Sequence, residues 1–121
     1  MKLRLDKFTK RFGDLTVIED MDLTVESGEM MALLGPSGCG KSTTLFAVCG
    51  IHRMNGGKLY FGGKDVTTLP AQERSVGVVF QNYALYPHMT VEQNIGFPLK
   101  VQKLPKPKIR TEVERLAELV Q

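Results

Sequence analysis

The chain has 121 residues, of which 42% are hydrophobic and 24% are charged, and its net charge is +3. This balance is typical of a single folded domain of modest size and argues against intrinsic disorder. No apolar run approaches the roughly 18 residues that span a membrane, and the opening MKLRLDKF alternates charge with leucine, unlike a signal peptide. We therefore expect a cytoplasmic chain of one domain.

Two further features argue against nucleic-acid binding and against a disulfide or metal site. The basic residues of segment 100–110 have no acid and no aromatic residue among them, which indicates a solvated surface and no nucleic-acid partner. Cys39 and Cys49 lie ten positions apart on a loop that runs into a helix. At about 1.5 Å per residue they are roughly 15 Å apart, too far for a disulfide. No His or Cys lies near them at a spacing that suits a metal ion.

The first half of the chain predicts strands and then a helix. Leu3 and Leu5 alternate with charged residues, as in a half-buried strand, and RFGD predicts a turn. Alternation resumes over residues 15–27 and predicts one or two more strands. MMALL, residues 30–34, has no alternation and predicts a strand buried on both faces. STTLFAVCG then predicts a helix that stops at Gly50.

In the second half, KLYF lies between two glycine pairs and predicts a short hairpin strand. VGVVF, residues 76–80, predicts a second buried strand. Thr90 and Gln93 form a capping box for a short helix to about Ile95, after which three prolines predict irregular chain: Pro98, Pro105 and Pro107. The tail 108–121 predicts an amphipathic helix. The whole pattern indicates a strand-rich N-terminal part that leads into an α/β core.

The spacing Gly35-x4-Gly40-Lys41-Ser42 matches the phosphate-binding P-loop. Glycines allow the backbone N–H groups to converge on phosphates, and Lys41 adds a positive charge. The Ser42 hydroxyl is a ligand for Mg²⁺, and the residues after it open a helix whose N-terminus favours an anion. Strand, loop and helix follow in the order that the motif requires. We therefore expect a site for a nucleotide with Mg²⁺.

ATP hydrolysis also needs an acid for Mg²⁺ and a group that orients water. The acid usually ends a second apolar strand, but 76–80 ends in Gln81, and the aspartates elsewhere in the chain do not fit. We therefore expect ATP binding without significant hydrolysis by these 121 residues. Because the two buried strands would lack neighbours, we also expect marginal stability and self-association.

Three blocks resemble the N-terminal part of the ATP-binding-cassette (ABC) ATPases, in the subgroup that energises importers of sugars and related solutes, such as the maltose importer. The blocks are KRFGD, GPSGCGKSTTL and PAQERSVGVVFQNYALYPHMTVEQNIGFPLK. The likeness covers almost every residue up to about 101. It implies a P-loop NTPase fold, with an antiparallel β part and an incomplete α/β core.

The resemblance also implies roles for single residues. Phe12 stacks on adenine, Lys41 and Gln81 are catalytic, and Ser42 and Gln81 contact Mg²⁺. Asn82 to Phe97 form the surface that receives the permease subunits. The phosphates and Mg²⁺ are held by the whole loop: Gly35, Pro36, Ser37, Gly38, Cys39, Gly40, Lys41, Ser42 and Thr43.

By the same likeness, residues 1–121 are the N-terminal part of a single ABC ATPase domain, ending before the signature motif and the second acidic strand. A complete molecule would pair head to tail with a second ATPase subunit and lie on the inner face of the cell membrane.

Two other interpretations stay open. One is a truncated, non-catalytic P-loop fragment, and the other is a small phosphotransferase, although the sequence shows no arginine-rich lid. His52 and His88 have no partners nearby in the sequence, which favours surface residues over ligands or bases for both.

Overall fold

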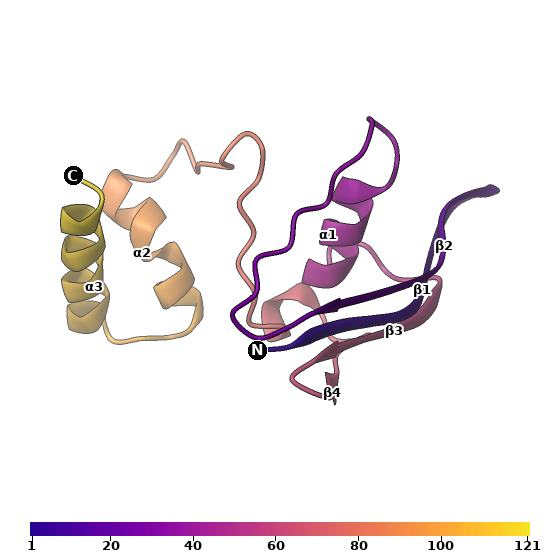
Figure 1. Cartoon of the computed structure of the whole chain (residues 1–121). Helices are drawn as coiled ribbons and strands as arrows, with labels where there is room; N and C mark the ends of the chain where they lie inside the picture. Colours follow the sequence, from indigo (N-terminus) through magenta and orange to yellow (C-terminus); the bar gives the residue numbers. More distant parts are fainter. The chain divides into compact units, whose positions relative to one another are not determined.

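The computed structural model describes all 121 residues, which form two compact units, residues 1–78 and residues 79–121. Figure 1 shows a sheet with a helix on its face in the first unit, whereas the second unit is helical. None of the helices has both the length and the apolar content needed to cross a membrane.

The first unit is built on a four-stranded antiparallel sheet with the strand order β2-β1-β3-β4. Tight turns join β1 to β2 and β3 to β4, as the RFGD turn and the second glycine pair predicted. Residues 15–25 form one strand. The strands are β1 (Leu3–Phe12), β2 (Leu15–Val25), β3 (Gly56–Phe61) and β4 (Lys64–Asp65).

The core lies between this sheet and α1 (Lys41–Cys49), as Figure 1 shows. Leu5, Phe8 and Leu59 are almost completely buried on the sheet, and Ala47 is buried on the helix. Their burial follows from the alternation of apolar and polar residues along β1 and β3. The antiparallel β part predicted from the sequence is thus confirmed.

The carboxyl end of α1 is fixed from two sides. Gly50 takes a left-handed conformation, and the N–H groups of Gly50 and Ile51 bond Ala47 and Phe46 in a Schellman motif. Arg74, only 6% exposed, follows the 3₁₀ turn η1 (Ala71–Glu73). Its guanidinium donates to four carbonyl oxygens, those of Ala47, Val48, Thr67 and Leu69. Burial lowers the pKa of Arg74, but the group stays charged.

The second unit consists of α2 (Val91–Val101) and α3 (Lys106–Leu119). The capping box of Thr90 and Gln93 is confirmed by both of its hydrogen bonds. The helix does not end at about Ile95, however, but continues through Pro98 to Val101.

The prediction of an irregular stretch around the prolines was therefore largely wrong. Pro98 removes one helical N–H, yet α2 packs closely on α3: a Cβ added at Gly96 would lie 2.9 Å from Cγ2 of Ile109. Pro105 is the N-cap of α3 and Pro107 lies in its first turn, where N–H groups have no helical partner in any case. The amphipathic tail helix is confirmed.

The predicted strands 30–34 and 76–80 are absent. Both segments lack regular secondary structure, and Met30, Leu34 and Val79 are 97%, 90% and 87% exposed. A strand needs a neighbour that supplies N–H and C=O groups. Every strand of this sheet pairs within β1–β4, and no residue of the chain pairs with either segment.

Candidate functional site

The loop 35–40 leads into the N-terminus of α1, which no side chain caps. Gly40 is the N-cap in a left-handed conformation (φ 93°), and a Cβ there would lie 3.0 Å from Cγ1 of Ile18. Glycine therefore allows both the turn and the packing of the loop on β2. No side chain caps the helix and no acid lies in its first turn.

These features leave the first N–H groups of α1 available to a ligand. The first helical bond runs from the Thr44 N–H to the Gly40 carbonyl oxygen, at 2.9 Å. Thr44 is buried and its hydroxyl donates to the same oxygen, whereas Ser42 is exposed and Thr43 half-buried. Uncapped N–H groups with the positive end of the helix dipole attract phosphate oxygens.

Lys41, the first residue of α1, folds its ammonium group back onto the loop 35–40. Its ammonium Nζ donates to the carbonyl oxygens of Gly35 and Pro36 at 2.6 and 2.7 Å, and it lies 3.4 Å from Sγ of Cys39. The charge is thereby fixed over the loop, where it adds to the field of the helix terminus. Cys39 is exposed and Cys49 buried, and both are free thiols, as predicted.

Phe12 ends β1 and offers an aromatic surface in the same unit. Its side chain is 43% exposed, and the Lys10 ammonium lies 4.7 Å from its ring centroid. The His52 ring is 5.5 Å away in an edge arrangement. His52 is half-buried and packs against two aromatic rings, those of Phe12 and Phe46, which the sequence did not predict.

The predicted phosphate and base groups all belong to the first unit, whereas Gln81 belongs to the second. Gln81 is exposed and begins a turn that continues to residue 84. Its contact with Mg²⁺ stays a prediction. Tyr83 and Leu85, which follow it, are 78% and 74% exposed, as expected of a binding surface.

Asn94 fixes the chain that follows this turn, and the sequence analysis did not single it out. Its amide oxygen accepts from the Tyr86 N–H at 2.9 Å, and its amide nitrogen donates to three carbonyl oxygens, of Tyr86, Met89 and Thr90. An asparagine in the first turn of a helix, where it is a poor helix former, is the signal that could have identified it. Arg74 had no comparable signal.

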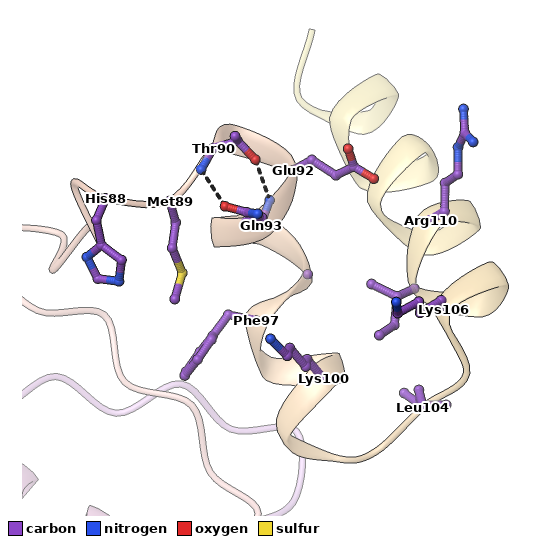
Figure 2. A pocket seen from close by; sticks show the side chains of 12 residues that line it. His88, Met89, Thr90, Glu92, Gln93, Phe97, Lys100, Leu104, Lys106 and Arg110 are labelled. Atoms are coloured by element: carbon purple, nitrogen blue, oxygen red, sulfur yellow. Dashed lines mark hydrogen bonds between the residues drawn. The ribbon is translucent and has the colours of Figure 1, made fainter.

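A groove of about 910 Å³ lies along α2 and α3 in the second unit. Its apolar lining comes from Met89, Phe97, Leu104 and Ile109, and Figure 2 shows Lys100, Lys106 and Arg110 beside them. Glu92 is the one acid of the lining. His88, exposed and 6.1 Å from the Tyr86 ring, contributes at one end.

Comparison with known proteins gives consistent matches. The family model described as ABC transporter matches residues 18–121. A sulfate/thiosulfate import ATP-binding protein of Gloeobacter violaceus is 47% identical over the whole chain, which covers 35% of that protein. A spermidine/putrescine import ATP-binding protein of Pasteurella multocida is 43% identical over 98% of the chain and 32% of its own length.

An Fe(3+) ions import ATP-binding protein of Photorhabdus laumondii is 47% identical over 98% of the chain, and the chain covers 34% of it. The chain thus spans about a third of the length of these relatives. Among solved structures, the dimeric post-hydrolysis state of the ATP-binding cassette MJ0796, bound to ADP and Pi, matches with a TM-score of 0.81. It is 25% identical, over 93% of this chain and 54% of that one.

Proposed function

Because the chain belongs to the ABC transporter family, we propose that it is the nucleotide-binding part of an ATPase subunit that powers solute import. One observation carries this proposal: the loop 35–40 leads into the uncapped N-terminus of α1, with the Lys41 ammonium over the loop. The names of these three relatives, all import ATP-binding proteins, support it.

In this proposal the N–H groups at the start of α1 and the charge of Lys41 bind the phosphates of ATP. Phe12 stacks on the adenine. The Ser42 hydroxyl and Gln81 would hold Mg²⁺, which, when bound, neutralises phosphate charge. These residues bind and orient the nucleotide, and we propose that the acid and the water-orienting group of hydrolysis come from outside these 121 residues.

The second unit would supply the contact with the permease. The groove along α2 and α3 has an apolar lining and a basic side, which suits an amphipathic helical segment of a membrane subunit. The exposed side chains of Asn82 to Phe97 extend that surface. We place the complete protein on the inner face of the cell membrane, paired with a second ATPase subunit.

For the cargo we propose a sugar or a related small solute, on the resemblance of residues 70–100. The relatives carry the names of sulfate/thiosulfate, polyamine and iron importers, so the cargo is a separate claim. Uptake of labelled sugars, sulfate, spermidine and Fe³⁺ by the assembled importer tests it. Uptake of an ion or a polyamine but of no sugar would contradict it.

The importer function is tested by separating ATP affinity from transport in the assembled transporter. Lys41→Ala should abolish both, whereas Gln81→Ala and Tyr83→Ala should reduce transport far more than ATP affinity. Lys64→Ala, at an exposed position of β4, is the matched control and should leave both unchanged. Loop variants that transport normally but bind ATP poorly would show that the assignment of the loop is wrong.

A further inference from the structure

His52 connects the end of β1 with the helix that follows the phosphate loop. Its ring packs against Phe12, the last residue of β1, and against Phe46 of α1, with both pairs of ring centroids 5.5 Å apart. The planes are inclined by 82° and 74°, the edge arrangement in which aromatic rings attract each other.

The short connection that carries His52 is fixed by backbone hydrogen bonds. The His52 N–H donates to the Phe46 carbonyl oxygen at 3.0 Å, and the Asn55 N–H donates to that of Thr9 at 2.9 Å. The Asn55 side chain in turn accepts from the Arg11 N–H at 2.7 Å. The backbone of His52 is thereby bonded to α1, and the connection that carries it is bonded to β1 through Asn55.

Phe12 is held on a second side by Lys10. That ammonium lies over the Phe12 ring and donates to the Arg53 carbonyl oxygen at 2.9 Å, in the same connection. Lys10 is only 9% exposed, so its charge is fixed in place. The cation over the ring and the His52 ring beside it both stabilise the observed orientation of Phe12, which still exposes 43% of its surface.

From this geometry we infer that His52 is a positioning residue for the nucleotide base. His52 links Phe12, the proposed base platform, to α1, whose N-terminus is the proposed phosphate site. It thereby sets the distance between the groups that would bind the base and the phosphates of one nucleotide. The inference rests on the proposed function, since Phe12 and the loop are the base and phosphate sites there. His52 acts through Phe12 and touches no reacting atom.

Two ligands separate this role from a general effect on folding: Mg-ATP, which has a base, and inorganic tripolyphosphate with Mg²⁺, which has none. His52→Ala should weaken ATP binding by roughly three- to tenfold, the value of one lost aromatic pair. Tripolyphosphate binding should not change. His52→Phe keeps a ring between Phe12 and Phe46 and should restore ATP affinity.

Three results would overturn the inference: an unchanged ATP affinity in His52→Ala, an equal loss for both ligands, or no rescue by His52→Phe. Failure of the proposed function looks different. In that case the wild-type chain binds neither ligand, or Lys41→Ala binds both as well as the wild type does, and both proposals fall together.

Discussion

Phe12 is a single side chain whose role can be measured apart from folding, because it is partly exposed and lies at the end of its strand. Phe12→Ala should weaken Mg-ATP binding by about 1–3 kcal/mol, the range for aromatic platforms that stack on bases. Phe12→Tyr keeps the ring and is the control. Fluorescence titration with an ATP analogue measures both, and equal affinities for wild type and Phe12→Ala would contradict the base-stacking role.

A second residue-scale prediction concerns Gly57, where β3 passes the irregular part of β1. Gly57 has φ +83°, and a Cβ there would lie 2.3 Å from the Lys7 carbonyl oxygen. Gly63 has nearly the same angle, +84°, with no atom within 4 Å of such a Cβ. Gly57→Ala should therefore lower the free energy of unfolding by about 2–5 kcal/mol, and Gly63→Ala by about 1–2 kcal/mol.

Urea denaturation of both variants gives the comparison. Because the two glycines share their positive φ angle, the difference between the variants reports the cost of the contact with β1. Equal destabilisation of the two variants would mean that β1 moves away from β3 at little cost in free energy. That result would contradict the prediction that the contact with the Lys7 carbonyl oxygen destabilises Gly57→Ala.

At the scale of elements, the β3–β4 hairpin contains an acid whose ionised form the fold favours. The Asp65 carboxylate accepts from the hydroxyl and the N–H of Thr67 at 2.6 and 3.0 Å, and Lys58 is nearby. These bonds lower the pKa of Asp65 below its ordinary value of 3.8. The resulting stability is therefore present above pH 3.8 and is lost as the pH falls from there through the lowered pKa.

The prediction is that Asp65→Asn reduces the loss of stability as the pH falls below 3.8, where the carboxylate of the wild type becomes protonated. Unfolding curves of both proteins at a series of pH values measure this. The effect should be modest because the carboxylate is exposed. If the two proteins lose stability in parallel below pH 4, the bonds from Thr67 contribute nothing.

Elements stabilised by local interactions could be predicted from the sequence. The antiparallel strands follow from alternation, the hairpin from its glycines, α1 from the P-loop and Gly50, and the start of α2 from its capping box. The candidate phosphate loop could be recognised because one continuous segment forms it. These features depend on neighbours within a few residues.

Elements that depend on distant partners were predicted wrongly or missed. Segments 30–34 and 76–80 have the composition of buried strands but no strand beside them. Pro98 stays helical because α2 packs on α3, which its own sequence does not show. The contacts of His52 and Arg74 join residues that are far apart in the sequence, so no short motif marks them.

At the scale of the whole molecule, we expect the exposed apolar segment 30–34 to promote association in solution. Met30 and Leu34 are almost fully exposed, and the backbone between them has no ladder partner. Unpaired extended chain with apolar side chains promotes association. We expect concentration-dependent oligomers in sedimentation velocity experiments, and Met30→Glu with Leu34→Lys should shift the protein toward the monomer.

Leu119→Glu is the control, since Leu119 is a similarly apolar residue, 72% exposed, at the end of a helix. It should leave association unchanged. A chain that stays monomeric at all concentrations, or a control that reduces association equally, would show that segment 30–34 is not the cause.

The central claim is that this chain binds Mg-ATP through the loop 35–40 and Lys41, and isothermal titration calorimetry of the wild type and Lys41→Ala tests it most directly. We predict saturable binding by the wild type and a severe loss in Lys41→Ala, because the variant removes the cation that lies over the loop. Lys64→Ala should bind like the wild type. Equal binding by the wild type and Lys41→Ala, or no binding by a folded wild type, would contradict the account.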